Sequence, residues 1–437
     1  MNDAGAVYPV RIDPTFSDAN WVSLPGADGT VDVTAVDGQG NLYIGGVFNT
    51  VGNTVASYVA KWNGSAWSAL GLGMDYAVEA LAFSSDGSVY ASGAFLTAIN
   101  NDGVPVTVNG IAKWDGSQWS PLGAGVTRGV DGYFFVDALA ISGTNLYAGG
   151  YFSAMGGVSA NYIAQWNGSA WSAVGSGMDD IVHTLTFFGG NLYAGGSFTN
   201  AGGTSALYIA QWNGSSWSAL GGGLDYGVNG LAVSGTNLYV GGNFNNAFNT
   251  GGATVPAHYV ARWNGSAWSA VGTGMNNTVD AVAVARDTLY VGGIFTTAGG
   301  VSANNIAQWD GSTWSALGSG TAPVNGGGDV RSLATSGTKL YAGGNFTMAG
   351  GVSANHIAEA LLVRPEFRGG PVRNADGSIG LNVATLTQST NRLYEASNLT
   401  PPIVWQPIYT NFTGGLWQFT DTNTAAFKSK FYRLSMP

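Results

Sequence analysis

Seven polar side chains recur at one position of a repeated hydrophobic segment. The segment has the form Val-x-Ala-Leu-Ala or a close variant. Its flanking positions are nearly constant, whereas its second residue is polar and varied: Asp32, Glu79, Asp137, His183, Asn229, Asp280 and Arg331. Four carboxylates and one histidine could hold a hard cation or bind a polar ligand if they converged. A solvated rim without a ligand is the structural alternative, and both interpretations stay open.

Glycine-led loops before some of these segments carry a second set of acids. They are Gly73-Met74-Asp75-Tyr76, Gly177-Met178-Asp179-Asp180 and Gly223-Leu224-Asp225-Tyr226. Asp75, Asp179, Asp180 and Asp225 are therefore candidate calcium ligands. The sequence has no Asp-x-Asp-x-Asp-Gly loop, so capping of the turns by these side chains is the competing interpretation.

The motifs of common catalytic sites are absent from the sequence. It contains no Gly-x-Ser-x-Gly elbow, no phosphate-binding loop and no His-Glu-x-x-His. It also has no cysteine, which excludes disulfides, thiolate metal sites and cysteine nucleophiles. These absences favour a protein that is not an enzyme. The chemistry that stays open is acid–base catalysis by a pair of the recurring carboxylates.

An internal repeat must position these residues. The pattern Leu-Tyr-x-Gly-Gly-x-Phe, with one variant copy, recurs around Tyr43, Tyr90, Tyr147, Tyr193, Tyr239, Tyr290 and Tyr341. Neighbouring tyrosines are 46 residues apart at the closest (147 to 193) and 57 at the farthest (90 to 147). This period is typical of four-stranded propeller blades. Segments such as Val78–Phe83, the Leu-Tyr-x-Gly-Gly run, Tyr162–Trp166 and Trp171–Val174 are the four predicted strands of each unit.

Pairs of tryptophans flank an Asn-Gly or Asp-Gly turn in six of the repeats. They are Trp62/Trp67, Trp114/Trp119, Trp166/Trp171, Trp212/Trp217, Trp263/Trp268 and Trp309/Trp314. Asn-Gly between two strands predicts a two-residue type I′ turn, which places Ala60 opposite Trp67. Because each aromatic side chain buries ~150–250 Å², we expect these rings to pack between blades. Platforms for sugar rings are the alternative.

The two ends of the repeat array predict how it closes. The seventh copy has a third strand, His356–Ala360, but no tryptophan pair, and the missing outer strand occurs at the other end as Trp21–Leu24. We therefore predict an all-β protein whose residues 21–363 form a seven-bladed β-propeller closed by an N-terminal strand, with residues 1–20 preceding it. Such closure removes free sheet edges.

The repeat stops after Val363. Residues 364–370 contain Pro365 and two glycines and are predicted to be a linker. Residues 371–437 are predicted to form a small, sandwich-like all-β module. Its expected strands are Ile379–Ala384, Arg392–Ala396, Val404–Tyr409, Leu416–Thr420 and Phe431–Leu434.

The Gly-Gly doublet followed by tyrosine and tryptophan resembles the kelch repeat and the wider galactose-oxidase-like propellers, as found in secreted bacterial multidomain proteins. The resemblance covers about residues 21–363 and implies the propeller fold, secretion and a C-terminal β module. One departure is that Tyr58 precedes Trp62 and Trp67 by four and nine residues, which is not the kelch spacing. The copper radical oxidases of that superfamily need a Tyr–Cys crosslink, so the absence of cysteine excludes their activity.

Composition narrows the set of partners. Only 9% of the 437 residues are charged, against a usual share of roughly 25%. The net charge is −10 without a basic cluster, which predicts no nucleic-acid binding. No apolar run approaches the ~18 residues that span a bilayer. The segment Met1–Gly5 does not have the pattern of a signal peptide.

These observations favour a non-enzymatic binding or structural scaffold that is extracellular or at the cell surface. Its expected partner is a protein or a glycan at that surface, with self-assembly also open. No cofactor is expected, although calcium stays open. The alternative is a carbohydrate-binding or carbohydrate-active propeller, a hydrolase or lyase, that uses the recurring carboxylates.

Overall fold

The computed structural model describes residues 16–323 and 328–362, and in the C-terminal part residues 366–367, 372–376, 378–385, 391–396, 406–411, 415–421 and 431–435. Apart from one 3-10 helix, η1 (Asp18–Asn20), the regular structure of these residues is all strand. The all-β prediction is confirmed. Contacts divide the chain into residues 21–360 and a second unit of 1–20 with 361–437. No helix in the described part of the chain is long and apolar enough to cross a bilayer.

Seven four-stranded antiparallel sheets occur among the described residues of 21–360. Their first strands are β2 (Val31–Val36), β9 (Val78–Phe83), β16 (Phe135–Ser142), β22 (Val182–Phe188), β29 (Val228–Ser234), β35 (Val279–Ala285) and β42 (Val330–Ser336). Their second strands are β3 (Leu42–Gly46), β10 (Val89–Gly93), β17 (Asn145–Tyr151), β23 (Asn191–Gly196), β30 (Asn237–Gly242), β36 (Thr288–Gly293) and β43 (Lys339–Gly344).

The two remaining strands of each sheet lie farther out. The third strands are β6 (Val59–Trp62), β13 (Ile111–Trp114), β20 (Ile163–Trp166), β26 (Ile209–Trp212), β33 (Val260–Trp263), β39 (Ile306–Trp309) and β46 (Ile357–Leu361). The fourth strands are β7 (Trp67–Ala69), β14 (Trp119–Pro121), β21 (Trp171–Ala173), β27 (Trp217–Ala219), β34 (Trp268–Ala270), β40 (Trp314–Ala316) and β1 (Trp21–Ser23).

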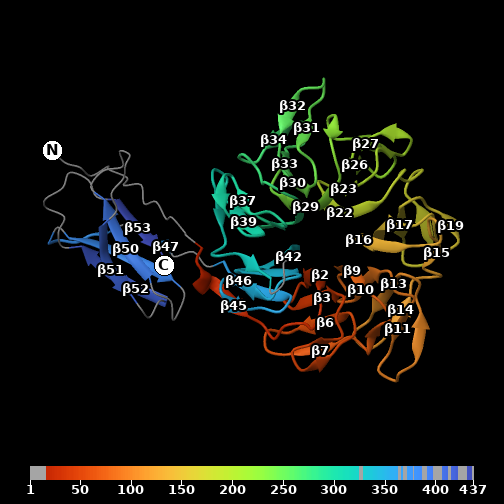
Figure 1. Cartoon of the computed structure of the whole chain (residues 1–437), viewed down its shortest axis with the longest axis horizontal. Helices are drawn as coiled ribbons and strands as arrows, with labels where there is room; N and C mark the ends of the chain where they lie inside the picture. The colour runs from red at the N-terminus through yellow and green to blue at the C-terminus, as the bar shows by residue number, and fades with distance from the viewer. Residues whose placement is uncertain are drawn as a thin grey trace. The chain divides into compact units, whose positions relative to one another are not determined.

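The first strands of the seven sheets contact one another around a centre, in the order β2, β9, β16, β22, β29, β35, β42 and back to β2 (Figure 1). Four-stranded sheets arranged radially in this way are a β-propeller, so the predicted propeller is confirmed. The sheet that begins with β42 takes its outer strand from the other end of the chain, because β1 pairs with β46 and Trp21 lies opposite Ala360.

The first glycine of the Gly-Gly doublet in the second strand is explained by the close approach of neighbouring sheets. A β-carbon on Gly45 would lie 2.6 Å from Cγ1 of Val78, which belongs to the next sheet. Equivalent contacts join Gly149 to Val182 and Gly195 to Val228. A larger residue here would push two sheets apart, which explains the glycine at this position of the repeat.

The predicted two-residue turn between the tryptophans is wrong. Trp62 lies directly opposite Trp67, with ring centroids 5.2 Å apart, and Ala60 lies opposite Ala69. The loop therefore has four residues, and its ends are joined by the hydrogen bond from Asn63 N to Ala66 O. Asn63 Oδ1 accepts hydrogen bonds from the backbone N–H groups of Ser65 and Ala66. The asparagine side chain thus closes this loop together with the backbone hydrogen bond, which a type I′ turn does not require.

The fourth-strand tryptophans join each sheet to its neighbour. Each indole Nε1 donates a hydrogen bond to a carbonyl just beyond the outer strand of the adjacent sheet. The pairs are Trp21–Leu317, Trp67–Pro25, Trp119–Leu70, Trp171–Leu122, Trp217–Val174, Trp268–Leu220 and Trp314–Val271, with distances from 2.7 to 3.1 Å. All seven rings are buried. This geometry matches the packing between blades that the repeat predicts.

Each repeat also contains a small side sheet that the four-strand prediction missed. The two-stranded ones are β4 (Thr50–Val51) with β5 (Thr54–Val55), β24 (Asn200–Ala201) with β25 (Thr204–Ser205), and β37 (Thr297–Ala298) with β38 (Val301–Ser302). The three-stranded ones are β8 (Gly73–Met74), β11 (Thr97–Ile99) and β12 (Pro105–Thr107); β15 (Val126–Arg128), β18 (Ala154–Met155) and β19 (Val158–Ser159); β28 (Gly223–Leu224), β31 (Asn246–Phe248) and β32 (Thr254–Pro256); and β41 (Thr321–Ala322), β44 (Met348–Ala349) and β45 (Val352–Ser353). Strands of two or three residues are too short to show an alternating pattern.

The C-terminal residues form two further sheets. One contains β47 (Glu366–Phe367), β48 (Val372–Arg373), β49 (Ile379–Thr385) and β52 (Gly415–Asp421), and the other contains β50 (Asn391–Ala396), β51 (Gln406–Asn411) and β53 (Phe431–Ser435). Strand β47 lies inside the segment predicted to be a linker and pairs with β49. The start of the strand predicted at 404 lies outside the described residues, as do residues 1–15 of the predicted N-terminal segment.

Candidate functional site

A β-bulge positions every one of the seven recurring polar residues. In β2, Val31 pairs with Gly46 and Val33 with Gly45, so that Asp32 is an extra residue without a partner. The same shift occurs in the other first strands, at Glu79, Asp137, His183, Asn229, Asp280 and Arg331. Bulges bend a strand locally and redirect a side chain. The bulge therefore explains why this position escapes the apolar pattern of its neighbours.

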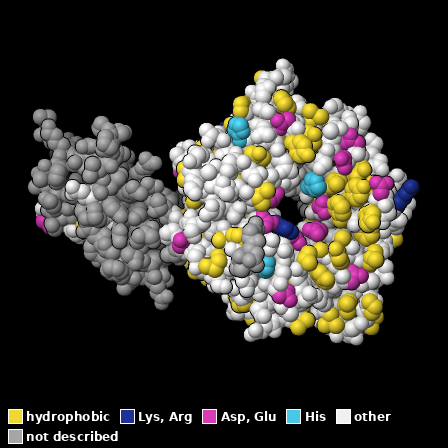
Figure 2. All heavy atoms as spheres, viewed as in Figure 1, with side chains coloured by type: hydrophobic (Ala, Val, Ile, Leu, Met, Phe, Trp, Pro, Cys, Tyr) yellow, Lys and Arg dark blue, Asp and Glu magenta, His cyan; other side chains and the backbone are white. Residues whose placement is uncertain are grey.

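The seven side chains line a single cavity. Its volume is about 490 Å³, and Asp329 is its eighth lining residue. Acidic side chains and one basic side chain surround the central hollow in Figure 2. The structure thus brings together all seven residues that the sequence singled out, and we call this cavity and its eight residues the mouth.

Asp329 is the mouth residue that the sequence analysis missed. It immediately precedes the valine that starts β42, where the other repeats have Thr30, Ala77, Phe135, Ile181, Gly227 and Thr278. A single charged residue at an otherwise uncharged repeat position was the available signal.

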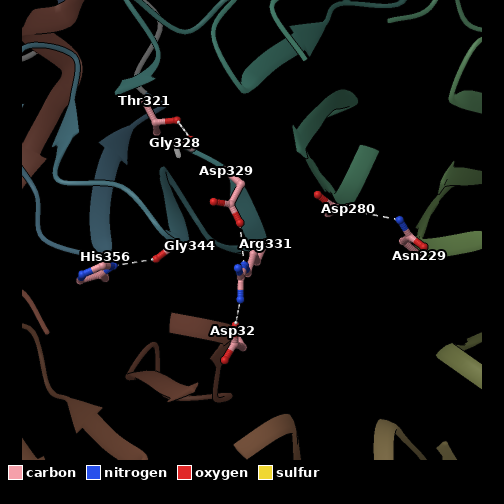
Figure 3. A network of polar contacts seen from close by, with 9 residues as sticks. All are labelled: Asp32, Asn229, Asp280, Thr321, Gly328, Asp329, Arg331, Gly344 and His356. Atoms are coloured by element: carbon pink, nitrogen blue, oxygen red, sulfur yellow. Dashed lines mark hydrogen bonds and ion pairs between the residues drawn. The ribbon is translucent and has the colours of Figure 1, made fainter. Parts of the chain in front are cut away.

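Arg331 joins two carboxylates, one two positions away in the sequence and one 299 positions away (Figure 3). Its Nη1 lies 2.8 Å from Asp32 Oδ1, and its Nε lies 2.6 Å from Asp329 Oδ2. Burial disfavours the charged guanidinium, but the hydrogen bonds that it donates to Asp329 and Asp32 outweigh this effect and raise the pKa of Arg331. Burial raises the pKa of Asp32 even though Arg331 opposes this shift. The arginine therefore supplies the positive charge for this side of the mouth.

Two further polar pairs lie around the mouth. His183 Nδ1 is 3.2 Å from Asp137 Oδ2, and its Nε2 is 3.1 Å from Ser197 Oγ. Asn229 Nδ2 donates a hydrogen bond of 3.0 Å to Asp280 Oδ1 (Figure 3). Burial raises the pKa of Asp137, and it raises that of Asp280 to about 6 against the opposing hydrogen bond from Asn229. Each pair holds its side chains in place before any ligand arrives.

Glu79 differs from the other mouth carboxylates. Within the described part of the chain, no group donates a hydrogen bond to its side chain. Burial, with the negative charges of Asp32 and Asp137, raises its pKa to about 7. Glu79 is thus the mouth acceptor that is free to receive a donor or a positive charge from a ligand.

The candidate calcium ligands in the loops do not meet at one point. Asp75 Oδ1 accepts hydrogen bonds from the backbone N–H groups of Leu96 and Thr97. Asp179 and Asp225 bind the matching loops of their own sheets in the same way, through residues 199–200 and 245–246. Asp180 Oδ1 accepts a bond from the N–H of Ile181. These contacts fit the turn-capping interpretation, and among the described residues no three His, Asp or Glu side chains are placed so that they could hold a metal ion.

No family model and no curated protein matches the sequence. Solved structures that are similar include the computationally designed Ika8 protein, with 15% identity, 78% of this chain and 98% of that chain covered, and a TM-score of 0.44. The WD40 β-propeller domain of Doa1 is 11% identical over 77% of this chain and 94% of its own, with a TM-score of 0.48. A catalytically inactive virginiamycin B lyase from Staphylococcus aureus with quinupristin is 11% identical over 78% and 98%, with a TM-score of 0.42.

Proposed function

We propose that the protein is a non-enzymatic binding scaffold, extracellular or at the cell surface, whose ligand enters the mouth. The observation that carries the proposal is the convergence of seven non-repeating polar residues, each on a bulge of its own strand, in one cavity. A repeat that keeps its core constant and varies only the residues facing one cavity is organised for recognition. The low charge content supports an extracellular setting.

We also propose that the scaffold is a seven-bladed ring that the N-terminal strand closes. Three contacts support this closure. Strand β1 pairs with β46, Trp21 donates a hydrogen bond to Leu317 O on one side, and Trp67 donates one to Pro25 O on the other. Strand β1 is therefore bonded to both neighbours in the same way as the outer strands elsewhere. A closed ring holds the mouth residues rigid, which lowers the entropy lost on binding.

The pairing of the mouth residues favours binding over catalysis. Arg331 forms ion pairs with both Asp32 and Asp329, and Asn229 holds Asp280. A fixed set of satisfied groups with one free acceptor, Glu79, suits a ligand that brings a positive charge or a hydrogen-bond donor. Because Arg331 already pairs with two carboxylates, we propose a mouth that functions without a bound calcium ion.

Titration calorimetry with the full chain tests the binding function. The ligands are a basic peptide, an acidic peptide and a set of neutral oligosaccharides, and the same set enters a hydrolase and lyase screen. We expect at least one ligand to bind without turnover, and the double variant Glu79→Gln with Asp280→Asn to weaken that binding. Asp310→Asn is the matched control, because it removes one charge from a hairpin where other repeats carry asparagine. Binding that the double variant leaves intact would contradict a ligand in the mouth.

The carbohydrate-active alternative has one observation in its favour. A carboxyl group with a pKa near 7, such as Glu79, can act as a general acid. This alternative expects the screen to detect cleavage of an oligosaccharide, and expects the variants Glu79→Gln and Asp137→Asn to abolish it. That result would overturn the non-enzymatic proposal.

A further inference from the structure

The residue that precedes each third strand adopts a left-handed backbone conformation. Its φ is 67° at Tyr58, 84° at Gly110, 63° at Tyr162, 66° at Tyr208, 70° at Tyr259, 63° at Asn305 and 65° at His356. Glycine and asparagine accept this conformation easily, whereas for tyrosine it costs about 1–2 kcal/mol. The chain nevertheless places tyrosine at four of the seven positions. A residue that bears such strain repeatedly is a candidate for a functional role.

These tyrosines lie at the mouth end of the propeller. Gly45 pairs with Val59 and Gly46 with Val31, so Tyr58 sits beside the start of the first strand, where Asp32 also lies. The same register holds for Tyr162 and Tyr208. The mouth and these rings therefore share one face of the molecule.

Further aromatic rings lie beside three of them, and two of these pairs are stacked. Tyr76 stacks on Tyr58 with centroids 6.4 Å apart and planes at 27°, and Tyr226 stacks on Tyr208 at 6.0 Å and 23°. Tyr151 lies 6.2 Å from Tyr162. We call Tyr58, Tyr76, Tyr151, Tyr162, Tyr208 and Tyr226 the tyrosine face. Tyr76 is 59% exposed and Tyr226 is 60% exposed, which leaves large aromatic surfaces in contact with water.

Carboxylates accompany the tyrosine face. Asp75 and Asp225 directly precede its two most exposed rings. Burial, then the charge of Asp131 and of Asp180, raises the pKa of Tyr151. Figure 2 shows both hydrophobic and acidic side chains on the face around the central hollow. Aromatic faces beside negative charges attract ammonium and guanidinium groups, and they repel phosphates and acidic sugars.

We propose that the tyrosine face and the mouth together bind an extended, cationic peptide segment of a partner protein. One lysine or arginine enters the mouth near Glu79, and others lie against the stacked tyrosines. This inference rests on the proposed function, which places a ligand in the mouth, and adds that the ligand is a positively charged peptide. Charge complementarity selects a basic peptide rather than a neutral glycan. The ligand must be extended because the three aromatic clusters lie in different sheets.

Calorimetry with hexalysine and hexaarginine tests the proposal, with hexaglutamate and a neutral oligosaccharide set as comparisons. We expect the basic peptides to bind, to bind more weakly as salt rises, and to lose about tenfold in affinity in the variant Tyr76→Ser with Tyr226→Ser. The variant Tyr162→Asn should also weaken binding of the basic peptides. Asparagine fits this backbone conformation, because Asn305 adopts it at the equivalent position. Val55→Ser is the control, because it removes a residue that is 75% exposed on the side hairpin β4–β5.

Each other outcome overturns the proposal in an identifiable way. If the basic peptides bind and only the mouth variants weaken them, the mouth function stands and the role of the tyrosine face is wrong. If a neutral oligosaccharide binds and the tyrosine variants weaken it, the face recognises a glycan instead. If hexaglutamate binds as tightly as hexalysine, or if neither basic peptide binds, the cationic partner is wrong. Melting curves of the variants identify any loss that comes from unfolding.

Discussion

Replacing Glu79 with glutamine tests the electrostatics of the mouth. The ordinary pKa of a glutamate is 4.5, and burial together with Asp32 and Asp137 raises that of Glu79 to about 7. Between these values the folded protein holds a proton that the unfolded chain has released. The folded state therefore binds more protons, and the free energy of unfolding must fall as pH rises through this window. At about 1.4 kcal/mol per pH unit, the loss amounts to about 3 kcal/mol.

Denaturant unfolding at a series of pH values from 5 to 8 measures this effect. The wild type should lose stability as pH rises, and Glu79→Gln should lose about 3 kcal/mol less over the same range. The variant and the wild type should be nearly equal at pH 5, where the wild-type side chain is already neutral. The remaining slope in the variant comes from Asp280, whose pKa burial raises to about 6, and from Asp32 and Asp137, whose pKa values burial also raises.

Asp310→Asn is the control for this experiment. Burial opposes ionisation of Asp310, but hydrogen bonds from the backbone of Thr313 and Ser312 outweigh it and lower the pKa. Its contribution to stability is therefore present above the ordinary aspartate pKa and is lost only at lower pH. We expect no change in slope between pH 5 and 8. Parallel curves for wild type and Glu79→Gln in that range would refute the reasoning about the mouth.

Three further predictions concern closure, charge and the hairpins. Gly350→Ala should destabilise the protein by about 1–3 kcal/mol more than Gly351→Ala. Both glycines have positive φ, but only a β-carbon on Gly350 would lie 2.0 Å from the Trp21 side chain. Equal melting temperatures of the two variants would argue against closure by β1. In the variant Arg331→Gln, the melting temperature should rise when calcium is added, because Asp32 and Asp329 lose the cation that pairs with them. An equal rise in the wild type would show that the mouth binds calcium even with Arg331 present. Asn167→Ala should lower the unfolding free energy by about 1 kcal/mol and Asn167→Asp should be nearly neutral, because the side chain accepts the turn's hydrogen bonds; an equal loss in both would contradict this.

The repeat made the propeller and the choice of site residues predictable from sequence. Tyrosine, Gly-Gly and tryptophan recur because each sheet meets its neighbours through the same contacts, as the approach of Gly45 to Val78 shows. A polar residue inside a constant apolar strand is conspicuous against such a background. That contrast identified Asp32, Glu79 and their five equivalents, although it could not reveal the bulge that turns them inward.

The sequence by itself therefore determined the strand order of the four-stranded sheets and seven of the eight residues that line the mouth. Tertiary structure alone decided which of these residues pair: Arg331 binds Asp32, 299 positions away, while Glu79 has no donor among the described residues. It also decided that Trp62 faces Trp67 directly and that Tyr76 stacks on Tyr58. The physical reason is that repeat patterns record contacts that every repeat shares, whereas pairing, burial and pKa depend on the particular neighbour that the fold places beside each residue.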